Sequence, residues 1–257
     1  MDIEWARLKA AEIRGLAARD AIVLVPIGAT EQHGPHLPVQ VDSRLGGEVA
    51  LRAARLVARS EPIAVLPPIW LGMSEHHMSL GGTITLDFAT MFALVRCVIR
   101  SLVRHGFRRI FILNGHGGNI AALETIVTEL TLEFQIPLAY GSYWDLAAED
   151  ISRILDRQKR VLHACEAETS MMLALTPELI DRDVLSQMHG PYIAGASGID
   201  GVNPAAYRWR NLASRSPNGV IGDASTATAE KGVLLLDAAA EALARTLSDR
   251  DLWRTPT

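Results

Sequence analysis

Short runs of apolar, often β-branched residues alternate along this chain with longer stretches in which apolar positions recur every three or four residues. The short runs predict extended segments at residues 21–28, 62–67, 83–86, 109–114 and 137–143. The longer stretches predict helices at residues 43–59, 88–105, 119–134, 146–157, 165–176 and 226–248. Continuous apolar strands separated by helices predict a mostly parallel sheet with helices on both faces.

The chain shows no internal repeat, low-complexity segment or linker, so we expect a single domain over residues 1–257. One irregular region, at about residues 188–225, is rich in Gly, Ser, Asn and Pro. A loop of this length inside a compact domain is typically functional or forms an interface. Its Tyr207–Asn211 portion (YRWRN) carries two arginines, which suit either a substrate anion or, with more weight, a subunit contact.

Composition narrows the function classes. The residues are 49% apolar and 21% charged, as is ordinary for a soluble enzyme, and the formal charge is −4. This balance provides no basic patch for nucleic acid and no Lys/Arg cluster for anionic lipid. No apolar run reaches the roughly 18 residues that a membrane helix needs. We therefore expect neither a nucleic-acid nor a membrane partner.

Cysteine usage bears on the compartment. Cys97 and Cys165 lie in apolar, helical contexts, which favours buried free thiols over a disulfide. The first 15 residues are amphipathic and carry early acidic residues, unlike a secretory signal peptide. These features predict a cytoplasmic protein.

Polar side chains follow two of the predicted strands at the point where each strand ends. Glu31 and His33 come shortly after the first strand, with Asp42 beyond them, and His116 follows the strand at 109–114. In open α/β sheets, ligands bind beyond the carboxyl ends of the strands. Because Glu31 and His33 are two residues apart, an extended segment places them on one face. Two carboxylates and two imidazoles fit a hydrolytic Zn²⁺, Mn²⁺ or Fe²⁺ site.

A simpler interpretation stays open at this point, because a histidine or glutamate at a strand end often only caps the chain or forms a hydrogen bond. The neighbouring glycines favour the ligand interpretation. Gly34 follows His33, and three glycines surround His116, a pattern typical of close backbone approach or a tight turn.

Three segments resemble the signature blocks of the creatininase (creatinine amidohydrolase) family. They are EQHGPHLP at residues 31–38 with Asp42, NGHGGN at 114–119 and HACEAETS at 163–170. The resemblance spans about residues 20–235 and implies a creatininase-like, three-layer α/β/α sandwich. It also implies a centre of one or two divalent metal ions, hydrolysis of C–N bonds in small amides, and a homo-oligomer, often a hexamer.

On matching positions, the resemblance implies that Glu31, Asp42 and His116 hold one metal and that His33 and Asp42 hold the second. The enzyme that gives the family its name has a further ligand, a glutamate two residues after the histidine of the second block. Gly118 stands at that position here. A second metal therefore needs another carboxylate, and the HACEAETS block offers two.

The sequence favours Glu166 over Glu168 as this replacement ligand. If the block is helical from His163, Glu166 at i+3 shares a face with His163, whereas Glu168 at i+5 points away. Glu166 could equally be a first-turn acid that favours the helix dipole. Glu168 would be a costly buried charge unless it is paired, which suits a supporting role.

Other candidate residues surround this centre. His163 matches a family histidine near the scissile bond and could carry a proton to the leaving nitrogen, or simply order the helix start. Glu166 is a second catalytic candidate in this block. His77 is a possible substrate contact. Tryptophans line the substrate pocket of the family's namesake, and Trp144 and Trp209 are the candidates here.

Competing chemistries lack their motifs, since the chain has no HExxH segment, no GxxxxGK[ST] loop and no cysteine cluster. We expect a metal-dependent amidohydrolase that cleaves a small, cyclic amide. Three other substrates stay open on the resemblance: a formamide-type amide, a peptide, or a cyclic ketone of inositol catabolism. A relative that binds a metal or small ligand without catalysis is the alternative from another class.

Overall fold

The computed structural model describes residues 2–191 and 209–255. A parallel sheet of four strands lies at its centre, in the order β2-β1-β3-β4. The strands are β1 (Ile22–Ile27), β2 (Ile63–Val65), β3 (Arg109–Asn114) and β4 (Leu138–Ser142). Every residue of β1 is buried, as expected for a central strand covered on both faces.

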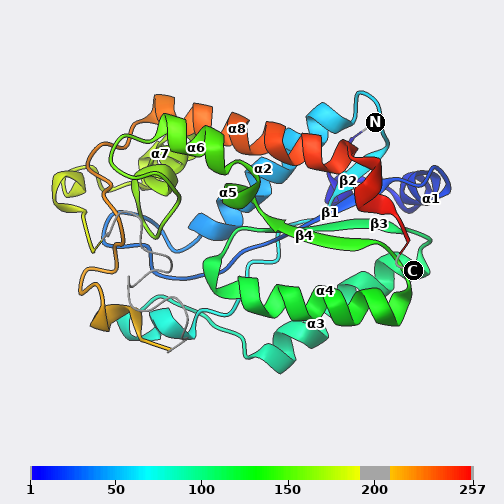
Figure 1. Cartoon of the computed structure of the whole chain (residues 1–257), viewed down its shortest axis with the longest axis horizontal. Helices are drawn as coiled ribbons and strands as arrows, with labels where there is room; N and C mark the ends of the chain where they lie inside the picture. Colours follow the sequence, from blue (N-terminus) through cyan, green and yellow to red (C-terminus); the bar gives the residue numbers. More distant parts are fainter. Residues whose placement is uncertain (1, 192–208, 256–257) are drawn as a thin grey trace.

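Helices form a layer on each side of the sheet (Figure 1). One layer contains α2 (Val41–Val57), α5 (Tyr143–Leu146), α6 (Ala148–Ile154), α7 (Glu166–Leu175) and α8 (Ala229–Ser248). The other contains α3 (Phe88–Arg104) and α4 (Ile120–Phe134), and α1 (Ala10–Ala18) packs into the same apolar cluster. This is the predicted three-layer α/β/α fold.

Alternation along β1 divides the core between the two layers. Ile22 and Leu24 pack into the cluster formed with α2, α7 and α8, whereas Val23 and Val25 pack into the cluster formed with α3 and α4. This follows because successive side chains of a strand point to opposite faces of the sheet. Each layer thus buries its own apolar stripe, and the strand ends remain free to carry polar loops.

Two predicted elements differ from the observed ones. Residues 83–86 are extended but lie outside the sheet, where Ile84 bridges Thr30 and Thr85 bridges Gly72. The predicted helix at 146–157 is divided into α5 and α6, with Ala147 as the non-helical junction. Among the described residues, no helix is long and apolar enough to cross a membrane.

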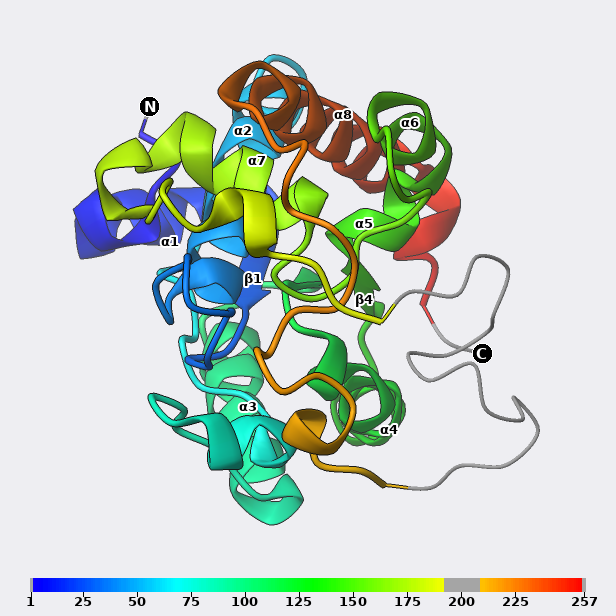
Figure 2. The same ribbon diagram turned by 90° about the vertical axis from the view of Figure 1, so that its left-hand side faces the viewer.

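Loops that follow the strands gather at one end of the molecule (Figure 2). The end of β1 leads into residues 28–40, β3 leads into the short 3-10 helix η3 (Gly117–Asn119), and β4 leads directly into α5. The 3-10 helices η2 (Glu75–Leu80) and η6 (Leu212–Ser214) pack together at the same end. The sheet therefore presents its carboxyl edge to one cluster of loops, and the candidate site lies there.

Candidate metal centre

Two glycines bring the first turn of α2 against the ends of the two central strands. A Cβ added at Gly28 would lie 2.5 Å from the backbone nitrogen of Ser43, and one added at Gly115 would lie 2.5 Å from the carbonyl oxygen of Asp42. Only glycine allows such an approach. As a result Asp42 stands between the loop after β1 and the turn after β3.

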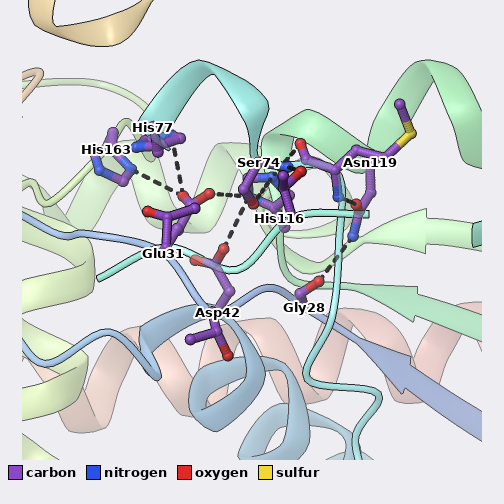
Figure 3. A network of polar contacts seen from close by, with 12 residues as sticks. Gly28, Glu31, Asp42, Ser74, His77, His116, Asn119 and His163 are labelled. Atoms are coloured by element: carbon purple, nitrogen blue, oxygen red, sulfur yellow. Dashed lines mark hydrogen bonds and ion pairs between the residues drawn. The ribbon is translucent and has the colours of Figure 1, made fainter. Parts of the chain in front are cut away.

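Two asparagines hold the turn that carries His116. The Asn114 side chain accepts a hydrogen bond from the His116 backbone N–H (3.1 Å) and donates one to its carbonyl oxygen (2.8 Å). Asn119 donates to the Gly28 carbonyl (3.0 Å) and accepts from the Met73 backbone N–H (3.0 Å). Figure 3 shows Gly28, His116 and Asn119 beside the carboxylates of Glu31 and Asp42. The NGHGGN segment is therefore a rigid turn tied to the end of β1.

The first group of candidate ligands contains Glu31, Asp42 and His116, all buried. His116 Nδ1 lies 2.9 Å from Asp42 Oδ2 and 3.4 Å from Glu31 Oε2. The other ring nitrogen, Nε2, lies 3.1 Å from the Met73 carbonyl oxygen and 3.2 Å from Ser74 Oγ. A carbonyl can only accept, so Nε2 carries a proton, and Nδ1 is the ring atom that faces the carboxylates and would bind an ion.

The second group contains His33, Asp42 and Glu168. His33 Nε2 lies 3.1 Å from Asp42 Oδ1 and 3.8 Å from Glu168 Oε2. His33 Nδ1 lies 3.1 Å from the Glu31 carbonyl oxygen and donates to it, so Nε2 is the ring atom that would bind an ion in this group. The two oxygens of Asp42 therefore belong to different groups, which is the arrangement of a carboxylate that bridges two ions.

Unsatisfied buried atoms test whether an ion fits. Glu31 Oε2, Asp42 Oδ2 and His33 Nε2 are buried, and among the described residues they face only the other members of the two ligand groups, with no hydrogen bond from outside them. Such groups are costly unless something compensates them. All three point into the two ligand groups, and their carboxylate and imidazole chemistry suits Zn²⁺, Mn²⁺ or Fe²⁺. The residues present thus fit a divalent metal centre.

The pKa values of His33 and His116 also indicate that this site favours a positive charge. Burial alone would lower the pKa of His33, but Asp42, Glu168 and Glu31 outweigh it and raise this pKa to about 9. Burial alone would also lower the pKa of His116, but Glu31 and Asp42 outweigh it, so this pKa lies well above its usual value. Three buried carboxylates stabilise a cation at these nitrogens, and a divalent ion would supply that charge.

Two further histidines approach Glu31, as Figure 3 shows, and both line the cavity described below. His77 Nε2 lies 3.3 Å and His163 Nδ1 lies 3.5 Å from Glu31 Oε1. Burial, and then the neighbouring histidines, lower the pKa of both rings, so both are neutral. The structure thus brings together His77 and His163 with the predicted ligands Glu31, His33, Asp42 and His116. Two alternative ligand groups contain Glu31 with His33 and His163, or with His76 and His77.

Glu166 does not lie where the sequence predicts it. Ala164 has a left-handed φ of +52° and Cys165 is the extended N-cap, so the helix begins at Glu166 rather than at His163. Glu166 points away from the ligand groups and pairs with Lys231 Nζ at 2.6 Å. Glu168 is the acid of this block that reaches His33 and Asp42, and the same geometry leaves Glu166 no place in catalysis at this centre.

A cavity of about 330 Å³ opens onto both ligand groups. Among the described residues, its polar wall includes Glu31, Asp42, His77, His116, His163 and Glu168, and its apolar wall includes Trp144, Ile120, Ile151, Leu162, Leu212 and Ile221. Trp144 therefore lies where a substrate contact was predicted. Trp209 does not, because the residue is 52% exposed and lies outside the described cavity wall.

Sequence reasoning missed two residues at this site. His76 lines the cavity, and its ring stacks on His116 with centroids 5.8 Å apart. Gln32 lies between two ligands, and its side-chain nitrogen lies 2.8 Å from His77 Nδ1 and 3.0 Å from His163 Nε2. Its place within the EQH segment was a usable signal, since an extended segment turns its middle residue away from its neighbours.

Comparison with known proteins places this geometry in a family. The profile of the family described as "Creatininase: Creatinine amidohydrolase" matches residues 6–247. The chain belongs to the creatininase family. Creatinine amidohydrolase of Pseudomonas putida is 32% identical over 248 residues, covering 89% of each chain. A mycofactocin precursor peptide peptidase of Mycobacterium ulcerans is 35% identical over 215 residues, covering 82% of this chain and 78% of the relative.

A third relative and the solved structures extend this likeness. The 3-dehydro-scyllo-inosose hydrolase of Thermotoga maritima is 28% identical, covering 93% of this chain and 81% of the relative. The crystal structure of creatinine amidohydrolase superposes with a TM-score of 0.75 at 28% identity, over 95% of this chain and 96% of that one. Similar creatininase structures include a mutant of Zn-Zn type and a manganese form. Family membership makes this chain a hydrolase.

The departure from the family pattern at Gly118 has a steric reason in this chain. A Cβ at this position would lie 2.3 Å from the Met73 carbonyl oxygen and 2.4 Å from His116 Nε2. The turn therefore has no room for a glutamate at residue 118. The carboxylate of Glu168 reaches the second ligand group from α7 instead.

Proposed function

We propose that this chain is a metal-dependent amidohydrolase that cleaves a C–N bond of a small amide at a centre of two divalent ions. The observation that carries the proposal is Asp42, whose two oxygens face two separate ligand groups. The ions would be held by Glu31, Asp42 and His116 and by Asp42, His33 and Glu168. Zn²⁺, Mn²⁺ and Fe²⁺ all suit this donor set.

A metal centre of this kind supplies hydroxide at neutral pH by lowering the pKa of bound water to about 7. The chain's own residues supply the remainder. His163 lines the cavity in its neutral form, and its Nδ1 faces Glu31, so it can accept a proton there and pass it to the leaving nitrogen. His77 holds Glu31 in place, and the apolar wall around Trp144 excludes water from the substrate.

The relatives support two substrate classes within this chemistry. Similarity to creatinine amidohydrolase favours a small cyclic amide as substrate, and similarity to the mycofactocin precursor peptide peptidase favours a peptide. A cavity of about 330 Å³ lies at the lower end of the range for small-molecule sites, which favours the smaller substrate. The inosose hydrolase makes a cyclic ketone the third candidate to be assayed.

The deciding experiment counts metal ions per chain by mass spectrometry after purification without chelators. We expect two per wild-type chain, loss of both in Asp42→Asn, and loss of one in His116→Ala. Asp145→Asn is the matched control, because Asp145 also lines the cavity but belongs to none of the ligand groups. Creatinine, short peptides and cyclic ketones are then assayed with the metal-loaded protein.

A wild-type chain that binds no metal, or an Asp42→Asn variant that keeps both ions, would refute the proposed centre. Metal binding without turnover of any of these substrates would instead favour a relative that binds ligands without catalysis. The compartment and the homo-oligomer stay predictions.

A further inference from the structure

Gln32 lies between Glu31 and His33 yet points to neither ligand group. The residue is only 8% exposed and is not part of the described cavity wall. Its amide nitrogen lies 2.8 Å from His77 Nδ1, 3.0 Å from His163 Nε2 and 3.4 Å from the Gly219 carbonyl oxygen. One buried amide thus touches both histidines that approach Glu31.

The orientation of this amide is fixed by the backbone. Gln32 Oε1 accepts a hydrogen bond from the Gly34 N–H at 2.9 Å, so the NH₂ group must face the histidines. His77 Nδ1 therefore accepts from Gln32. A neutral imidazole has one donor and one acceptor, so His77 Nε2 carries the proton and donates to Glu31 Oε1.

His163 takes the opposite role at the same glutamate. Its Nε2 lies 2.9 Å from the Gln32 backbone carbonyl oxygen, which needs an N–H donor. The two amide hydrogens of Gln32 are then used by His77 Nδ1 and by the Gly219 carbonyl. The other tautomer of His163 would give up the bond to the Gln32 carbonyl. With Nε2 protonated, His163 Nδ1 presents its lone pair toward Glu31 and the cavity.

We infer that Gln32 is a positioning residue that sets the Nε2–H tautomer in both His77 and His163, so that the two rings turn opposite groups toward Glu31. Its side-chain N–H makes His77 a donor that orients Glu31, and its backbone carbonyl makes His163 an acceptor on the reacting side. For its catalytic consequence the inference rests on the proposed metal centre. The tautomers themselves can be measured without turnover.

Another buried glutamine provides a matched control. Gln158 is 1% exposed, and its amide donates to the Arg160 carbonyl (2.8 Å) and accepts from the Asp223 N–H (3.2 Å). It supports the part of the cavity wall that contains Arg160, but it does so only through hydrogen bonds to backbone groups. Gln158→Met thus removes an equally buried amide while leaving both histidine contacts of Gln32 in place.

The experiment labels the histidine rings with ¹⁵N and records ring nitrogen shifts by solid-state NMR, on protein as purified and loaded with Zn²⁺. His77→Phe and His163→Phe assign the signals. We expect both rings as Nε2–H tautomers in the wild type and in Gln158→Met. In Gln32→Met, His77 is expected to populate both tautomers, while His163 keeps its backbone bond.

Competition with a chelator measures Zn²⁺ affinity in the same proteins. We expect Gln32→Met to bind Zn²⁺ about 10–100-fold more weakly than Gln158→Met, the usual effect of losing a group that orients a ligand. An Nδ1–H tautomer of His77 in the wild type would overturn the inference. So would unchanged His77 shifts in Gln32→Met, whatever the protein binds or hydrolyses.

Discussion

Glu166 and Glu168 stand two residues apart in the first turn of α7, and both are buried, but their surroundings are opposite. Glu166 accepts from the backbone N–H groups of Asp156 and Arg157, both at 3.1 Å, and pairs with Lys231. Glu168 accepts one backbone N–H, from Ala164, at 2.6 Å, and otherwise faces a carboxylate and a histidine.

The contrast shows that the partners of a buried carboxylate, more than its burial, indicate its role. The charge of Glu166 is balanced within the protein, and bonds to Asp156 and Glu166 raise the pKa of Lys231 although burial opposes this. Burial, and then Asp42, raise the pKa of Glu168 to about 8, although His33 opposes this. A group that is costly to ionise alone becomes an ordinary ligand when a divalent ion is present.

Neutralising Glu168 should have the largest effect. We expect Glu168→Gln to reduce bound metal from two ions to one per chain and to lower kcat/KM by more than the ~100-fold typical of groups that only support a ligand. Glu166→Gln is the matched control and should keep both ions. Elemental analysis and kinetics on the same preparations test this prediction. Equal metal loss in the two variants would show that Glu168 and Glu166 do not differ in metal binding.

Removing the partner of Glu166 should affect stability rather than chemistry. Lys231→Met leaves Glu166 as a buried charge without its ion-pair partner, which costs about 3–5 kcal/mol of unfolding free energy. For a chain of this size we expect the Tm to fall by about 2–4 °C per kcal/mol. Metal content should stay at the wild-type value.

The double variant Glu166→Gln/Lys231→Met checks the cause of that loss. Because it removes both charges, it should recover most of the stability, as measured by denaturant unfolding. A double variant as unstable as Lys231→Met alone would mean that the lysine acts through packing.

Thermal stabilisation by added metal should also distinguish the role of Glu168 from that of Glu166. An ion that binds only the folded state stabilises it by about 2.7 kcal/mol at 100 times its Kd. We expect added Zn²⁺ to raise the Tm of the chelator-treated wild type and of Lys231→Met by similar amounts. In Glu168→Gln the rise should be smaller, because one ligand group is incomplete. Thermal melts with and without Zn²⁺ measure this directly.

Most of the fold could be predicted because its signals are local. The strand at 109–114 coincides with β3, and the helix at 88–105 ends one residue from the observed α3. The break between α5 and α6 could not be predicted, because Ala147 is a good helix former and the local sequence contains no helix-breaking residue there. The segment at 83–86 looks like a strand, but tertiary bridges hold it outside the sheet.

The candidate site, like the fold, could be predicted from the sequence only in part. Glu31, His33, Asp42 and His116 converge because parallel strands deliver their loops to one edge, a rule that sequence alone can apply. The choice between Glu166 and Glu168 depended on where one helix begins, and the left-handed Ala164 moved that point by three residues. Trp144 and Trp209 could not be distinguished, because only the three-dimensional path of the loops sets their distance from the cavity.

The smallest expected effect concerns Cys165, the N-cap residue between His163 and the two glutamates. Cys165 is buried, and burial, followed by Glu168, raises the pKa of its thiol to about 12, whereas Cys97 is exposed on α3. Since the thiolate is the reactive form, iodoacetamide at neutral pH should label Cys97 and leave Cys165 unmodified, as peptide mass spectrometry can show.

The same labelling compares the two carboxylate environments. Burial is the larger cause of the raised pKa, so Cys165 should remain protected in Glu168→Gln. In Lys231→Met the start of α7 loses the ion pair that fixes it, and local opening should increase the labelling rate of Cys165. Cys97→Ser provides the background-free measurement. Faster labelling in Glu168→Gln than in Lys231→Met would mean that the metal ligands, rather than the Glu166–Lys231 pair, hold this helix start in place.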